Sequence, residues 1–83
     1  MHPQEIKKLI EDHLAGSIAI LEGEDGRHFQ ATVISPEFAD KTRIQKQQLV
    51  YAALNRYITD GTIHAISIKT FTPEEWRNQN KES

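Results

Sequence analysis

The first apolar positions of the chain recur at a helical period. Counted from Ile6, the next apolar residues follow after three, four and eight positions. Pro3 suits the first turn of a helix and Gly16 a helix end, so residues 3–15 are predicted to form an amphipathic helix. Residues 17–22 form a candidate strand, and a glycine-bounded turn leads into residues 28–35, where apolar and polar side chains alternate. The pattern therefore predicts a β-hairpin behind the first helix. The apolar positions are Ile6, Leu9, Ile10 and Leu14 in the helix, and Phe29, Ala31 and Val33 in the second strand.

The second half of the chain adds two helices and a strand. A proline breaks the preceding strand, and residues 36–39 have room for one short helical turn. Apolar residues at helical spacing over residues 42–58 predict the main packing helix. β-Branched residues over 63–69 predict a third strand. A capping threonine and a glutamate surround Pro73, so a short C-terminal helix is predicted to begin there, with Trp76 closing the core.

This order of elements predicts the fold class. The sequence α-β-β-α-β-α is typical of an α+β two-layer sandwich, with the helices packed on one face of a three-stranded mixed sheet. The hairpin strands pair antiparallel, whereas the third strand arrives through a helical crossover and is expected to pair in parallel. The length fits one domain over residues 1–83.

Composition narrows the kinds of site that the chain can build alone. The 83 residues include no cysteine, which excludes disulfides and metal sites made from the chain's own thiolates. Ten lysines and arginines against twelve aspartates and glutamates give a net charge of −2, which argues against wholesale wrapping of nucleic acid. No targeting or membrane-spanning segment is recognisable, so a cytoplasmic location without membrane contact is expected.

The sequence also lacks a pattern typical of catalysis. It has no nucleophile with a base at a recognisable spacing, no phosphate-binding loop and no evident pair of catalytic carboxylates. We therefore expect a binding protein and not an enzyme.

Two histidines are candidate metal ligands. His64 falls early in the predicted third strand, and His28 opens the second strand on its exposed face. The pattern alone favours a hydrogen-bonded boundary residue for His64 and an exposed residue without function for His28. Metal ligation by neutral imidazole is the alternative. Carboxylates near His28 could instead form a hard-metal site, although turn carboxylates are usually only solvated; these are Glu22, Glu24 and Asp25.

Three cations cluster at the start of the predicted main helix, namely Lys41, Arg43 and Lys46. Cations at a helix N-terminus oppose the macrodipole by roughly 0.3–1 kcal/mol each, so helix stability does not explain them. A solvated basic edge, a protein contact and a DNA contact are all compatible with this cluster. With residues 36–39 as a first helix, the layout imitates a helix-turn-helix.

Two long segments resemble the signatures of the BolA family. Residues 38–51 (FADKTRIQKQQLVY) resemble its central signature, and residues 63–76 (IHAISIKTFTPEEW) resemble its second, with a strand histidine and a Thr-Pro-x-x-Trp helix start. Residues 26–29 (GRHF) resemble its variable cluster-ligand loop in the histidine form. The length is similar to that of the compact IbaG-type bacterial members. Asp40 stands where the family often has glycine, which leaves open the geometry of the turn before the main helix.

The resemblance implies a fold similar to class II KH domains and a partnership with monothiol CGFS-type glutaredoxins. In such complexes a 2Fe–2S cluster is bridged between the two proteins, which makes His64 the expected ligand and His28 the expected second ligand. Because this chain has no cysteine, the sulfur ligands would come from the glutaredoxin and glutathione. The implied roles are iron–sulfur cluster assembly, trafficking or iron regulation, and a part in stress response.

The resemblance also leaves a second function open. Some members of the family are implicated in transcription regulation through a helix-turn-helix-like element, so a DNA-binding regulator that uses Lys41, Arg43 and Lys46 is the alternative. An interaction module without a cluster and a weak homodimer are further expectations that the sequence does not separate.

Overall fold

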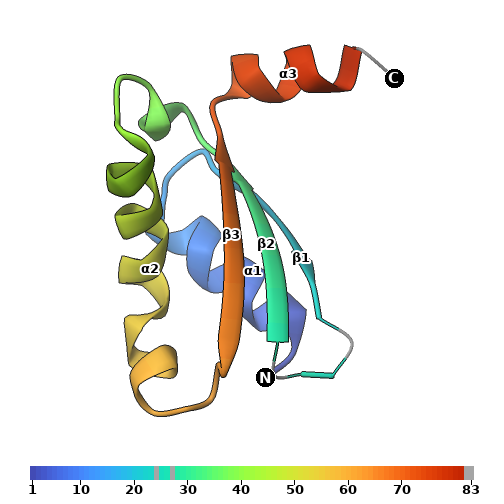
Figure 1. Cartoon of the computed structure of the whole chain (residues 1–83), viewed down its shortest axis with the longest axis vertical. Helices are drawn as coiled ribbons and strands as arrows, with labels where there is room; N and C mark the ends of the chain where they lie inside the picture. The colour runs from blue at the N-terminus through green and yellow to red at the C-terminus, as the bar shows by residue number, and fades with distance from the viewer. Residues whose placement is uncertain (24, 27, 82–83) are drawn as a thin grey trace.

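The computed structural model describes residues 1–23, 25–26 and 28–81. Two residues singled out from the sequence fall outside this part of the chain, namely the candidate carboxylate ligand Glu24 and Arg27 of the loop-like segment. Figure 1 shows a sheet with long helices packed against it, and the N-terminus at the opposite end of the molecule from the C-terminal helix. The elements are α1 (Pro3–His13), β1 (Ile18–Glu22), β2 (His28–Ile34), the 3₁₀ turn η1 (Pro36–Phe38), α2 (Arg43–Thr59), β3 (Ala65–Phe71) and α3 (Pro73–Lys81).

The sheet has the mixed pairing that the crossover predicted. Its strand order is β1-β2-β3, with β1 and β2 antiparallel and β2 and β3 parallel. The α+β prediction is therefore confirmed. Because β2 is central, β1 and β3 are both edge strands, and one side of each is without a neighbouring strand in the described part of the chain.

The core lies between the sheet and the two long helices. Ile6 and Ile10 of α1 and Val50 and Leu54 of α2 are fully buried, and each such side chain contributes about 1.5–3 kcal/mol of burial free energy. The sheet contributes the side chains of alternate positions, including Phe29. Within the described ranges, no helix is long and apolar enough to cross a membrane.

The third strand starts later than the sequence predicted. Residues 63–69 were expected to form it, whereas β3 begins at Ala65 and leaves His64 just outside the ladder. The preceding residues remain tied to the end of α2, because the Ile63 N–H donates to the Tyr57 carbonyl at 3.0 Å. Hydrophobicity alone suggested a strand at Ile63, but this side chain is buried as part of the core cluster before the strand begins.

The C-terminal helix lies beyond the end of the sheet and not beside α1 and α2 (Figure 1). The expectation that Trp76 closes the main core is therefore wrong. Its ring packs on Phe71 with 5.4 Å between centroids. By strand alternation Phe71 faces the side of the sheet opposite the helices, where its register partner Ile34 is only 4% exposed. Phe71 and Trp76 thus belong to a small apolar cluster on the open face.

The turn before α2 keeps a backbone conformation that favours glycine. Asp40 has φ of 63°, in the left-handed region. Two residues later, Thr42 caps the helix through its side chain, which accepts from the Gln45 N–H at 3.2 Å while the Gln45 amide oxygen accepts from the Thr42 N–H at 3.0 Å. This capping box fixes the start of α2 at Arg43.

Candidate metal centre and basic groove

His28 and His64 lie side by side at one end of the sheet. Parallel pairing of β2 with β3 places His28 opposite Ala65, the residue after His64. The two imidazole rings are 6.3 Å apart between centroids, with 65° between their planes. Both residues are exposed. Residues 36 positions apart in the chain thus form a pair that the sequence could suggest but not place.

Asp25 fixes the orientation of His28. One carboxylate oxygen accepts from the His28 backbone N–H at 2.8 Å, and the other lies 2.7 Å from Nδ1 of the ring. Because an ionised carboxylate can only accept, this contact requires a proton on Nδ1, so in the neutral ring the Nε2 lone pair is left for another ligand. Carboxylate–histidine contacts of this kind orient metal-binding imidazoles in proteins.

The carboxylates near His28 do not complete a metal site in the described structure. Glu22, Asp25 and His28 line one shallow hollow, together with Gly23 and Gln30. Among the residues the structure describes, however, no three His, Asp or Glu side chains are grouped closely enough to hold a metal ion. The histidine pair therefore offers two nitrogen ligands and would need its remaining ligands from another molecule.

The three candidate cations do not share one surface. Lys41 precedes the helix and lines a hollow with Asp40 and Gln45, whereas Arg43 and Lys46 line a groove between α2 and β3. The sequence placed the three together because they are close in the chain. The helix separates them because it begins only at Arg43 and turns by about 100° per residue.

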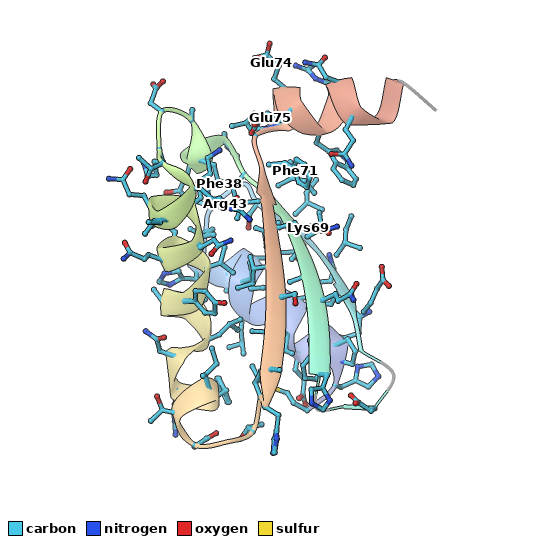
Figure 2. The ribbon with its side chains drawn as sticks, viewed as in Figure 1. Phe38, Arg43, Lys69, Phe71, Glu74 and Glu75 are labelled. Atoms are coloured by element: carbon cyan, nitrogen blue, oxygen red, sulfur yellow. The ribbon has the colours of Figure 1, made fainter. Side chains whose placement is uncertain are left out.

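The groove between α2 and β3 has a volume of about 340 Å³ and includes a cation that sequence reasoning missed. Lys69, on β3, lines it together with Arg43 and Lys46. Figure 2 shows Arg43 between α2 and β3, and Lys69 with Phe71 on the β2 side of β3. A lysine in an edge strand is a recognisable signal, but the sequence does not reveal that β3 is an edge.

One carboxylate partly neutralises this groove. Glu75 lies 3.7 Å from the Lys46 ammonium, whose side chain is only 16% exposed. The backbone N–H of Thr72, which donates to Glu75 at 2.8 Å, is the main cause that lowers the pKa of this carboxyl. Lys46 is therefore already paired, and Arg43 and Lys69 are the more accessible cations.

Comparison with known proteins supports one family throughout. The sequence model described as BolA-like protein matches residues 4–75. The chain is 40% identical to the acid stress protein IbaG of Escherichia coli K12 over 81 residues, which is 98% of this chain and 95% of that protein. A solved structure of a BolA protein homologue from Coxiella burnetii superposes with a TM-score of 0.81 at 41% identity, covering 93% of this chain and 97% of that chain.

A more distant relative carries a different description. The DNA-binding transcriptional regulator BolA of Haemophilus influenzae is 37% identical over 54 residues, which is 65% of this chain and 52% of that protein.

Proposed function

The chain belongs to the BolA family, and on that premise we propose that it is an adaptor that binds a 2Fe–2S cluster jointly with a monothiol CGFS-type glutaredoxin. It would act in iron–sulfur cluster assembly, trafficking or iron regulation. The observation that carries the proposal is the adjacency of the exposed His28 and His64 rings.

The spacing of the two rings fits ligation of one iron after a small movement. Two imidazoles on one tetrahedral ion have centroids roughly 5 Å apart, because each ligating nitrogen lies about 2 Å from the metal. The observed 6.3 Å is about 1 Å longer than that. Both side chains are exposed, so rotation about their side-chain bonds can close this gap.

The composition of the chain supports a shared cluster. Two histidines replace two cysteines on one iron of Rieske centres, where they raise the reduction potential. Without a cysteine, this chain has no thiolate for the other iron. The partner's cysteine and glutathione would supply the sulfur ligands, while Asp25 keeps His28 turned so that Nε2 is available.

The proposal is tested by mixing the protein anaerobically with a cluster-loaded monothiol glutaredoxin and recording visible absorption and circular dichroism. We expect a heterodimer with a spectrum that shows partial nitrogen ligation, with iron and sulfide in equal amounts. His64→Ala should abolish the spectral change and His28→Ala should alter it. His13→Ala is the matched control, because His13 is an exposed histidine at the end of α1, and it should leave the spectrum unchanged. An unaltered spectrum with His64→Ala would show that the ligand assignment is wrong.

DNA binding is the second candidate function. Two observations favour it: the description of the Haemophilus influenzae relative, and the exposed Lys41 and Arg43 around the start of α2. Because Lys46 is largely covered and paired with Glu75, two phosphate contacts are expected and not three.

A salt titration measures that number. Two contacts give a slope of about −2 in a plot of log affinity against log salt, at roughly −0.9 per contact. Duplex DNA binding with this slope would support a function as a DNA-binding regulator, provided that Arg43→Gln reduces the magnitude of the slope by about one. Absence of measurable binding at low salt would remove it.

A further inference from the structure

The two edge strands of the sheet differ in how far their outward backbone N–H and C=O groups are hydrogen-bonded. At the β1 edge, two side chains of α1 reach the backbone of Ala19: Lys7 donates to its carbonyl at 3.0 Å, and Glu11 accepts from its N–H at 2.9 Å. Lys7 and Glu11 also form an ion pair at 2.6 Å. The hydrogen-bonding groups that an added strand would need at Ala19, the second residue of β1, are therefore occupied.

The β3 edge is open by comparison. The Phe71 carbonyl accepts from the Ser35 N–H at 3.0 Å, so the backbone groups of Phe71 face β2. By alternation, the N–H and C=O groups of Ile66, Ile68 and Thr70 point away from β2. Within the described part of the chain, the contact found at these outward groups is a long one of 3.4 Å from the Gln47 side chain to the Ile68 carbonyl.

Positive charge lies on both sides of this open edge. Arg43 and Lys46 line the groove on its α2 side, and Lys69 projects from the strand itself. Alternate side chains of an added strand would point to these two sides in turn. Acidic side chains on that strand would meet a cation on either side.

We propose that the outer edge of β3 accepts an extended acidic segment of a partner protein as a fourth strand. Backbone hydrogen bonds to Ile66, Ile68 and Thr70 would supply affinity, and Arg43 and Lys69 would select acidic side chains. A second copy of this chain is disfavoured as the occupant, because two β3 edges paired with each other would bring like charges together. The surface is distinct from the histidine pair and does not depend on a cluster.

The proposal is tested by nuclear magnetic resonance with the isotope-labelled protein and a peptide that carries two adjacent glutamates, Val-Glu-Glu-Val, so that one glutamate faces each side of the edge. We expect saturable shifts of the amides of Ile66, Ile68 and Thr70, with slower exchange of these amides. A peptide with lysines in place of the two glutamates, Val-Lys-Lys-Val, should leave them unchanged. The same titration with His64→Ala should match the wild type, which separates this result from that of the cluster proposal.

Charge reversals identify the selecting residues. Arg43→Glu and Lys69→Glu should each weaken binding of the acidic peptide about tenfold. Arg43 is exposed and a glutamate is favourable in a first helical turn, so the fold should be kept. Lys41→Glu is the matched control: it makes the same charge change near the same helix end but outside the groove, and should change binding less than about twofold.

Three results would overturn the proposal. The first is that the acidic peptide leaves the three outward amides unshifted. The second is that duplex DNA shifts them while the peptide does not, and the third is that they become protected at high protein concentration without peptide, which would assign the edge to self-association.

Discussion

At the scale of single residues, Asp40 shows how one backbone angle constrains a side chain. It is the one non-glycine residue in the described ranges with a positive φ, at 63°. Glycine adopts this region without a Cβ penalty, and aspartate tolerates it better than most other residues. The sequence revealed that an aspartate stands where the family often has glycine. It could not show whether the backbone at this position still adopts the left-handed conformation that glycine favours. The structure shows that the left-handed turn is retained.

Replacements at Asp40 should follow this angle. Asp40→Gly should be at least as stable as the wild type, and Asp40→Ala should be about 1 kcal/mol less stable than Asp40→Gly, because alanine has the Cβ without a local polar contact. Urea denaturation followed by circular dichroism measures both. The neighbouring Ala39, whose φ is −58°, is the control, and Ala39→Gly should destabilise slightly because only the unfolded chain gains freedom. Equal stability of the two Asp40 variants would contradict the argument.

At the scale of elements, α1 stabilises the sheet through its polar flank as well as its apolar face. Glu11 holds Lys7 and the Ala19 N–H together, which joins α1 to the outer edge of β1. The Lys7 ammonium is the first cause that lowers the pKa of the Glu11 carboxyl, and the Ala19 N–H is the second. A carboxyl with a lowered pKa in the folded state stabilises the fold above its usual pKa and loses this contribution as the pH falls through the folded value.

Glu11→Gln should therefore cost roughly 1 kcal/mol near neutral pH, a value reduced by the partial exposure of the pair. The difference from the wild type should shrink as the pH falls from the ordinary value of 4.5 through the lowered folded value, because the carboxyl of the unfolded chain is protonated first and that of the folded chain follows. Urea denaturation at a series of pH values measures this. A difference that stays constant down to pH 3 would show that the carboxylate charge is not responsible.

Element boundaries also show where sequence patterns stop being sufficient. Apolar periodicity, β-branched runs, and capping and proline signals located the helices and strands, because each of these is a local property of the chain. They misplaced the start of β3, since the Ile63 N–H is bonded to the end of α2 and its side chain joins the core cluster before the strand begins. They also misassigned Trp76, whose partner Phe71 lies on the open face. Both errors concern which surface buries an apolar side chain, and local spacing does not contain that information.

At the scale of the whole molecule, the parallel pairing of β2 with β3 determines which residues from distant parts of the chain become neighbours. It brings His28 next to His64 and exposes the β3 edge, and neither result could be read from the chain before strand order was known. The candidate ligands His28 and His64 could be named from the sequence because the segments that contain them resemble signatures of the family, whereas the residue pattern alone did not single them out as ligands. Lys69 could not be added to the cations, because the crossover determines that its strand forms a groove with α2.

The length of β3 also sets the distance between the histidine pair and the basic groove. The histidine pair lies just before the first residue of this seven-residue strand, and the basic groove lies along its last residues, so about 20 Å of rigid sheet separates their far ends. A fourth strand paired along Ile66 to Thr70 would end about 7 Å from His64, at roughly 3.3 Å per residue, so the two proposed partners would lie next to each other along one strand.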